Sequence, residues 1–336
     1  MILKDQLNRP LRDLRISVTD RCNFRCTYCM PKEVYGTHYK FMRRDELLSF
    51  EQLIRVVRLF AELGVVKVRI TGGEPLARQR IEVLIKMIAQ IKGIEDISLT
   101  TNASLLTADK ARLLKTAGLN RLTVSLDALD NDAFTGMNNV AFPVDRILEN
   151  IDHARAAGFK PIKINMVVIK GSNDDQVLAM VRHFRGHDYI LRLIEYMDVG
   201  NSNRWKLEQV VPAQSLIKLI NEQFPIAAVD ANYRGEVAKR WRYKDGQGEI
   251  GFITSVSQPF CRSCTRLRLS AEGKLYTCLF ATRGHDLRQL LNEGYSDEQI
   301  KHYIIDLWSQ RTVRYSELRS AQTTALPKIE MSYIGG

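Results

Sequence analysis

The six cysteines of this 336-residue chain form two groups of three that lie far apart in the sequence. The first cysteine group is Cys22, Cys26 and Cys29, and the second cysteine group is Cys261, Cys264 and Cys278. No apolar leader segment is visible, so we expect a cytoplasmic protein whose thiols stay reduced. Clustered thiols in that compartment indicate metal binding or redox chemistry rather than disulfides.

The first cysteine group has the spacing C-x3-C-x2-C, and three thiolates suit a soft metal. A closed zinc site needs four ligands, and the nearest histidine, His38, lies outside the run. A [4Fe–4S] cluster held by three cysteines leaves one iron free for a small-molecule ligand. We therefore predict such a cluster here, and keep zinc with a distant fourth ligand as the alternative.

The second cysteine group, with the spacing C-x2-C-x13-C, also supplies three ligands and no obvious fourth. We predict a second [4Fe–4S] cluster with one open iron. The alternative is a zinc site completed by His285.

The elements that position these cysteines alternate between strand-like and helix-like segments over the first 200 residues. The strand candidates are 14–18, 66–70, 97–101, 121–126, 162–168 and 190–194. The intervening segments have helical periodicity, and two of them end at Gly118 and Gly158. Repeated βα units predict a parallel sheet, either doubly wound or closed into a barrel.

Polar and apolar residues alternate within the first five strand candidates. In the first of them, Leu14 and Ile16 alternate with Arg15 and Ser17, whereas Arg192 interrupts the apolar face of the sixth. Helices must cover the apolar faces, so the polar faces should enclose a wet or ligand-filled interior. An antiparallel sheet with one solvated face is the alternative, but the connections are long enough for crossover helices.

The pattern weakens beyond residue 200, where short strands are predicted at 249–255, 266–269 and 274–276. We divide the chain into a barrel domain, 1–200, and a C-terminal domain, 201–336, that carries the second cysteine group and ends in an extended Gly-Gly tail.

No run approaches the ~18 apolar residues of a membrane span, so no membrane partner is expected. The net charge of +11 suits either nucleic acid or a strongly anionic small ligand.

Two motifs together resemble the radical S-adenosylmethionine (SAM) superfamily: the first cysteine group after the first strand, and Gly72-Gly73-Glu74-Pro75 after the second. The whole chain resembles the GTP 3′,8-cyclase family, also called molybdenum cofactor biosynthesis protein A. The supporting segments are 71–76, 100–102, 124–128, 260–268 and the Gly335-Gly336 end. One residue departs from the family pattern, Ala103, where the family usually has glycine.

The resemblance implies an α/β fold, a partial βα barrel of about six units with a C-terminal extension of short strands around a second iron–sulfur cluster. It implies that SAM is cleaved reductively at the first cluster and gives a 5′-deoxyadenosyl radical. This radical is implied to take H3′ from the ribose of GTP. Attack on guanine C8 then gives 3′,8-cyclo-7,8-dihydro-GTP, the first step of molybdenum cofactor (molybdopterin) biosynthesis. The second cluster is implied to bind guanine through its open iron.

The resemblance also assigns roles to individual residues, with the two cysteine groups as ligands of the two clusters. The implied SAM contacts are Tyr28, Gly73, Ser125 and Met197. The implied GTP contacts are Arg15, Lys67, Arg69, Thr100, Lys163, Arg266, Leu267 and Arg268. Arg15 is also implied to help quench the late radical, and Gly335 and Gly336 to reach into the active site. Several of these cations lie on the polar strand faces, where they would pair with a triphosphate.

The family resemblance further implies a homodimer, a reducing partner of the flavodoxin or ferredoxin type, and a downstream cyclic pyranopterin monophosphate synthase. Two other functions remain open at this point. One is a radical SAM enzyme with an auxiliary cluster that modifies a peptide, and the other is a metal-containing protein that binds nucleic acid. Cations that face the barrel interior argue against both, because nucleic acid needs an external basic stripe. We therefore expect no nucleic-acid partner.

Overall fold

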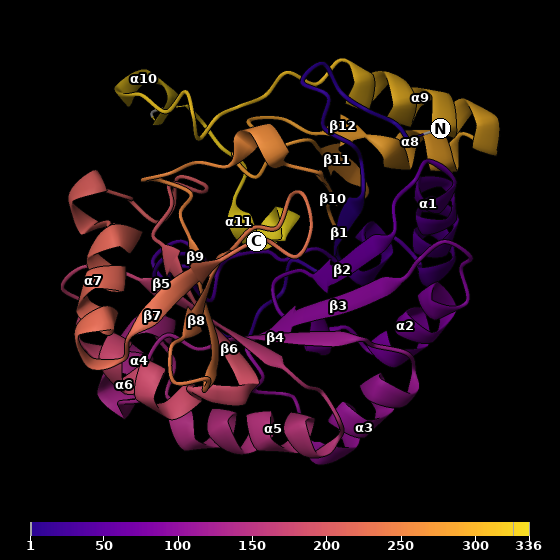
Figure 1. The fold of residues 1–336 in the computed structure, drawn as a ribbon. Coiled ribbons are helices and arrows are strands. Elements are labelled where there is room, and N and C mark those ends of the chain that lie inside the picture. Colours follow the sequence, from indigo (N-terminus) through magenta and orange to yellow (C-terminus); the bar gives the residue numbers. More distant parts are fainter. Residues whose placement is uncertain (1, 325, 336) are drawn as a thin grey trace.

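The computed structural model describes residues 2–324 and 326–335, and its centre is an incomplete ring, a curved sheet of six parallel strands (Figure 1). These strands are β1 (Asp13–Ser17), β2 (Lys67–Thr71), β3 (Asp96–Thr101), β4 (Arg121–Ser125), β5 (Ile162–Val168) and β6 (Gly186–Glu195). They follow one another in the sheet in the order of the sequence. The six predicted strands and their parallel pairing are confirmed, each strand within a few residues of its expected position.

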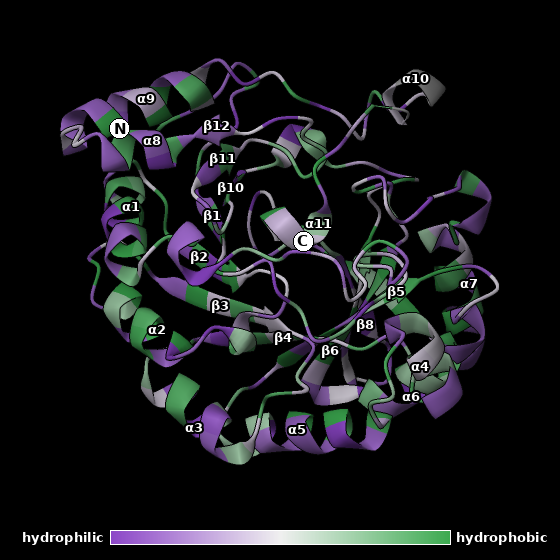
Figure 2. Cartoon of the chain, turned by 180° about the vertical axis from the view of Figure 1, so that it is seen from behind, coloured by the Kyte–Doolittle hydropathy of each residue, from purple (hydrophilic) through white to green (hydrophobic). Residues whose placement is uncertain are grey.

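Helices follow the strands and pack around the outside of the ring (Figure 1). They are α1 (Phe50–Glu62), α2 (Ile81–Ala89), α3 (Ala108–Thr116), α4 (Asn131–Asn138), α5 (Val144–Ala156) and α6 (Val177–Phe184). Helix α1 begins at a capping box in which Ser49 and Gln52 satisfy each other's backbone N–H groups. Figure 2 shows hydrophobic and hydrophilic residues interspersed along α1, α3 and α5, as expected of helices that bury one face.

The alternation along the strands places apolar side chains in the hydrophobic core and polar side chains toward the inside of the ring. Leu14 and Ile16 of β1 are fully buried in the hydrophobic core beneath the helices. Arg15, between them, lines a pocket inside the ring. The predicted orientation of the polar strand face toward the inside of the ring is therefore confirmed, and the antiparallel alternative is wrong for these strands.

The C-terminal part of the chain extends the same sheet at both edges. Strand β9 (Gly248–Ile253) pairs in parallel with β6, and β10 (Arg266–Leu269) pairs in parallel with β1. Beyond them lie β8 (Lys239–Tyr243), β7 (Ile226–Val229), β11 (Lys274–Tyr276) and β12 (His285–Asp286), so that the described residues form a 12-stranded sheet. The barrel is thus nearly closed, and the division at residue 200 stays a prediction that marks no break in the sheet.

Strands β7, β8 and β12 are not anticipated by the sequence pattern. Strand β8, with the sequence KRWRY, exposes charged residues because it lies near the sheet edge, and this hides the usual apolar alternation. The remaining helices are α7 (Ala213–Gln223), α8 (Leu287–Asn292), α9 (Asp297–Ser309), α10 (Ala321–Thr324) and α11 (Met331–Ile334). In the described part of the chain, no helix combines the length and apolar character that crossing a membrane requires.

The end of the chain lies inside the ring rather than beside it (Figure 1). The sequence predicts an extended tail here, but residues Met331–Ile334 form the short helix α11. Ser332 and Ile334 are buried, so contacts with the barrel rather than local propensity determine this turn. Gly336 lies outside the described residues, and its predicted role stays a prediction.

Candidate active site

One pocket inside the ring is lined by all six cysteines, although the two groups are distant in sequence. Its empty space is about 1740 Å³, including the part that is open to solvent. The structure therefore brings both predicted cysteine sites to one cavity.

The loop after β1 presents the first cysteine group. Arg25 holds this loop in shape: its Nη1 donates to the carbonyl of Cys22 over 2.7 Å, and its Nε donates to the carbonyl of Tyr35 over 2.7 Å. Phe24 is buried and packs against the rings of Phe134 and Phe142, which fixes the loop to the core. The cysteines are thus positioned by packing on both sides of the loop.

The Gly-rich segment after β2 passes directly beside the cysteine loop. A Cβ at Gly73 would overlap the backbone of Arg21, so only glycine fits at this position. The next residue, Glu74, is buried and accepts hydrogen bonds from Thr101 Oγ1 over 2.7 Å and from the N–H of Asn102 over 2.8 Å. Burial raises the pKa of Glu74 to about 7. This carboxyl group therefore ties β2 to the end of β3.

Ala103 follows these residues with a φ of +59° in a fully buried position. Residues with a Cβ rarely adopt this left-handed conformation, which explains why the family usually has glycine here. The N–H of Ala103 donates to Thr101 Oγ1, and its carbonyl accepts from Asn150, so the turn forms despite the alanine.

Carboxylates and burial dominate the surroundings of the first cysteine group. Burial raises the pKa of Cys22 to about 12, and the charge of Glu74 adds to the shift. Burial, followed by Asp127, also raises the pKa of Cys26 well above its usual value. The free thiols are therefore held protonated, and iron would replace those protons on binding. Three sulfurs around one buried cavity fit a [4Fe–4S] cluster with an open position.

Cationic groups dominate the surroundings of the second cysteine group. Burial alone would raise the pKa of Cys264, but the positive charges of Arg266 and Arg311 outweigh it and lower the pKa to about 5. Arg311 Nη2 donates to Cys264 Sγ over 3.2 Å. Burial raises the pKa of Cys278. The three sulfurs line the same pocket and fit a second cluster, with one thiolate already stabilised by its neighbours.

Within the described residues, no three His, Cys, Asp or Glu side chains converge closely enough to hold a metal ion. Among these described residues, the second cysteine group and His285 therefore do not converge on one zinc ion, as the zinc alternative requires. His285 lies in β12, paired with Leu275 of β11. The ligands of a four-iron cluster surround a cube of iron and sulfide rather than a single ion.

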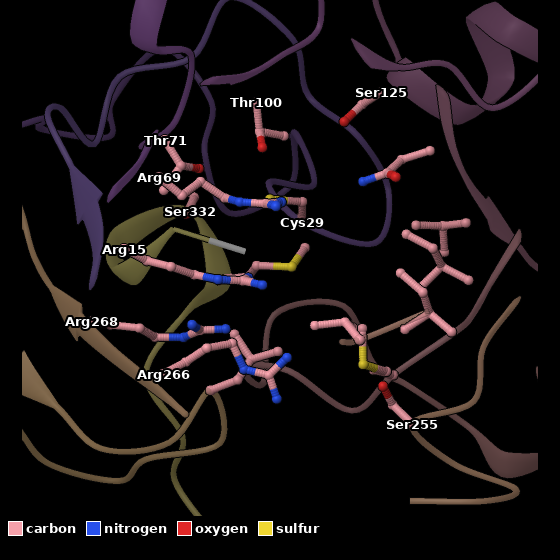
Figure 3. A pocket seen from close by; sticks show the side chains of 18 of the residues that line it. Arg15, Cys29, Arg69, Thr71, Thr100, Ser125, Ser255, Arg266, Arg268 and Ser332 are labelled. Atoms are coloured by element: carbon pink, nitrogen blue, oxygen red, sulfur yellow. The ribbon is translucent and has the colours of Figure 1, made fainter. Parts of the chain in front are cut away.

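Arginines form one wall of the pocket that the two cysteine groups line. Figure 3 shows Arg15, Arg69, Arg266 and Arg268 extending into the pocket from neighbouring strands. Burial and the charges of Arg268 and Arg69 lower the pKa of Arg15, because these cations face one another without enough anions between them. The guanidinium groups stay protonated at neutral pH. Such a wall suits a strongly anionic ligand.

Several buried polar atoms of this wall lack a hydrogen-bond partner among the described residues. They are Thr100 Oγ1, Asn165 Oδ1, Arg192 Nε and Arg268 Nε. Buried polar groups are ordinarily satisfied, so these atoms mark positions where a ligand can bond. Arg192 and Asn165 are not among the residues predicted from the sequence, although a lone arginine on the apolar face of β6 was a usable signal.

Most of the predicted ligand contacts line one of two neighbouring pockets. The four predicted SAM contacts line the main pocket, as do Arg15, Arg69, Thr100, Arg266 and Arg268 of the predicted GTP contacts. Lys67 instead lines a smaller pocket that shares Arg15, Arg69 and Arg266, with its Nζ 3.2 Å from the ring centre of Tyr233. Lys163 lines neither pocket, and Leu267 is fully buried in the core.

Contacts with the loop after Met197 hold the tail in place. Lys328 Nζ donates to the buried Asp198 over 3.1 Å, and Glu330 accepts from the N–H groups of residues 201 and 202. The chain then enters the ring, where Met331 and Ser332 line the main pocket. A Cβ at Gly335 would overlap the methyl group of Thr71, so the tail lies directly against β2.

The fold and the cysteine-lined pocket define a radical SAM protein. Residues 16–184 match the Radical SAM superfamily, and residues 189–317 match Molybdenum Cofactor Synthesis C. The GTP 3′,8-cyclase of Staphylococcus carnosus (strain TM300) is 50% identical over 338 residues, covering 99% of each chain. That of Acidothermus cellulolyticus (strain ATCC 43068 / DSM 8971 / 11B) is 48% identical over 359 residues, again covering 99% of each. The chain belongs to the GTP 3′,8-cyclase family.

Solved structures support the fold alone. The crystal structure of Streptococcus suis SuiB bound to its precursor peptide SuiA has a TM-score of 0.63 and 17% identity. The match covers 94% of this chain and 68% of SuiB.

Proposed function

We propose that this protein converts GTP to 3′,8-cyclo-7,8-dihydro-GTP, the first step of molybdenum cofactor biosynthesis. The observation that carries the proposal is a single pocket lined by both cysteine groups and by four arginines, in a chain that is 50% identical to a GTP 3′,8-cyclase.

The first cysteine group would hold one [4Fe–4S] cluster, beside SAM contacts at Tyr28, Gly73, Ser125 and Met197. When bound, this cluster and SAM supply the radical chemistry that removes H3′ from the ribose. Tyr28 is fixed for this contact by its hydroxyl, which donates to Asp127 over 2.8 Å. Gly73 allows a ligand to approach the backbone closely.

The second cysteine group would hold the other cluster and orient guanine, while the arginine wall binds the rest of GTP. Hydrogen bonds to charged groups contribute ~1.5–3 kcal/mol each, so Arg15, Arg69, Arg266 and Arg268 account for tight and oriented binding. We assign Lys67 and Lys163 to the triphosphate and Leu267 to a backbone contact. Arg15 lies among these cations, and we assign it the further role of quenching the late radical.

The tail would shield the reacting atoms from water. Met331 and Ser332 already line the pocket, and Gly335 lies against Thr71 at the end of β2. We extend this role to Gly336. We further propose that residues 1–200 form the radical SAM barrel with the first cluster, and that residues 201–336 form a C-terminal domain that carries the second cluster.

We propose the cytoplasm as the location, a homodimer as the assembly, and a flavodoxin or ferredoxin type protein as the reductant. The product would pass to a cyclic pyranopterin monophosphate synthase. None of these partners is needed for the central test, because dithionite can supply the electrons.

The test is an anaerobic assay of reconstituted protein with dithionite, SAM and GTP, with ATP as the control nucleotide. We expect 5′-deoxyadenosine to form in step with the loss of GTP and no loss of ATP. SAM cleavage without nucleotide loss would favour the peptide-modifying alternative. No SAM cleavage by protein with full iron and sulfide content would overturn the proposal.

A further inference from the structure

Two buried arginines and one buried aspartate lie behind the second cysteine group. Asp5 is 7% exposed, Arg9 0% and Arg311 5%. Arg9 Nε donates to Asp5 Oδ2 over 2.6 Å, and Arg311 Nη1 donates to the same oxygen over 3.3 Å. We call this set the Asp5–Arg9–Arg311 network.

Both arginines of the network reach the cysteine loop itself. Arg9 Nη1 donates to the carbonyl of Cys261 over 2.9 Å. Arg311 Nη1 donates to the carbonyl of Cys264 over 3.0 Å, and its Nη2 donates to Cys264 Sγ over 3.2 Å. The N-terminal segment and the segment after α9 therefore clamp the loop that carries two of the three ligands.

The position of Arg311 is fixed on its other side by an aromatic ring. The Arg311 guanidinium carbon lies 4.5 Å from the ring centre of Trp308, and Trp308 Nε1 donates to the carbonyl of Arg9 over 3.2 Å. A guanidinium group held by a carboxylate, a carbonyl and a ring loses little further freedom when it bonds to sulfur. The N–H···S contact is therefore preorganised.

The network carries two positive charges and one negative charge in a buried position. Within the described residues, Arg311 Nε and Arg9 Nη2 are also buried without a hydrogen-bond partner. Buried charge that is not compensated is costly. The thiolates of the second cysteine group and the cluster they hold would supply the missing negative charge.

The first cysteine group has no comparable cation on its sulfurs in the described structure. The side-chain contact at Cys22 Sγ is the neutral amide of Asn102 at 3.8 Å, and the nearby charges are mixed, because Glu74 is negative and Arg25 is positive. Hydrogen bonds to sulfur and nearby charge are two of the means by which a protein sets the reduction potential of an iron–sulfur cluster. The two sites differ in both.

We propose that Arg311, held by Asp5 and Arg9, is a positioning residue that raises the reduction potential of the cluster on the second cysteine group. A positive charge and an N–H donor stabilise the added electron, so the reduced cluster is favoured. The inference rests on the proposed function, because it requires that cluster to be present.

The test is a reductive titration of the full-length holoenzyme, followed by electron paramagnetic resonance. The signal of the second cluster is the part of the spectrum that the Cys264→Ala variant lacks. In Arg311→Gln we expect about a tenfold lower ratio of reduced to oxidised second cluster at a given potential, equal to ~59 mV for one electron. Arg311→Lys keeps the charge but loses the planar fork, so its shift should be smaller and in the same direction.

The matched control is Arg314→Gln, which removes a charge from the same segment. Arg314 is more exposed and pairs with Glu317, so we expect no shift. Unchanged midpoints in both Arg311 variants, with full iron content, would overturn the inference. If Arg311→Gln loses its iron, an unchanged midpoint in Arg311→Lys overturns it alone. Wild-type protein that binds no iron at the second cysteine group would instead contradict the proposed function.

Discussion

The first cysteine group is surrounded by carboxyl groups, whereas the second cysteine group is surrounded by guanidinium groups. Glu74 and Asp127 raise the pKa values of Cys22 and Cys26 beyond the effect of burial. Arg266 and Arg311 lower the pKa of Cys264 to about 5 against the effect of burial. The two groups therefore offer the same ligand type in opposite electrostatic surroundings, within one pocket.

This contrast matches the charges of the two molecules that the pocket is proposed to bind. SAM carries a positive sulfonium, which suits the carboxyl groups around the first cysteine group, and GTP carries a strongly anionic triphosphate, which suits the arginine wall. Opposite charge around the two cysteine groups discourages either ligand from binding at the wrong group. The surroundings, more than the cysteines, thus separate the two tasks.

The largest expected effect comes from removing one thiol from each group. Cys26→Ala should abolish SAM cleavage, because it removes a ligand of the cluster beside the SAM contacts. Cys264→Ala should leave SAM cleavage intact but stop the loss of GTP. Chromatography of 5′-deoxyadenosine and GTP checks both, with iron content as the control. If Cys264→Ala lost SAM cleavage while the first cysteine group kept its iron, the two cysteine groups would not have the separate roles described here.

Removing one arginine from the wall should affect one ligand only. Arg268→Gln should weaken GTP binding by about 10- to 100-fold, since a charged hydrogen bond contributes ~1.5–3 kcal/mol. SAM binding should not change. Calorimetry of each ligand with anaerobic protein measures this, and Arg262→Gln, whose side chain is 82% exposed, is the matched control. Equal weakening of both ligands would contradict a divided pocket.

The affinity for GTP should fall as the pH rises above about 7. Burial, followed by Arg192, Arg121 and Arg69, lowers the pKa of Lys163 to about 7. A triphosphate nearby would raise that pKa, so the complex takes up a proton, and raising the pH opposes binding by up to about tenfold per pH unit. The measurement is GTP affinity between pH 6.5 and ~8.5. Lys163→Met should weaken binding at low pH and flatten the profile, and an unchanged slope would show that another group titrates.

The smallest expected effect concerns the backbone beside the first cysteine group. Ala103→Gly relieves a left-handed conformation but adds freedom to the unfolded chain, so the free energy of unfolding should rise by no more than ~1 kcal/mol. Denaturant unfolding of the full chain measures it. A loss of stability would mean that the Ala103 methyl contributes more by packing in the core than its conformation costs.

The sequence predicts the six central strands because a ligand-filled barrel forces a period of two on each of them. Leu14 and Arg15 need opposite environments, and that requirement is visible without any structure. The predicted cysteine ligands and most of the predicted cation wall also meet in one pocket, because each follows a strand or lies on one. Local patterns were sufficient wherever the strand itself positions the residue.

The sequence does not predict what depends on distant partners. Arg311 follows α9 in an irregular segment, and nothing local distinguishes it from a solvated cation. The pairing of β10 with β1 and of β9 with β6 likewise depends on contacts between strands far apart in the chain. Tertiary packing also overrode the expectation of an extended tail, since α11 forms only against the barrel wall.

The strand order has a consequence for the synthesis of this protein. Strands β1 and β6 are the outer members of the central ring, and their partners β10 and β9 come from much later in the chain. A chain of which only the first 200 residues have left the ribosome therefore exposes two unpaired strand edges, each ready to pair with another chain. A nascent or truncated chain of that length should aggregate or recruit chaperones until the last third emerges and covers both edges.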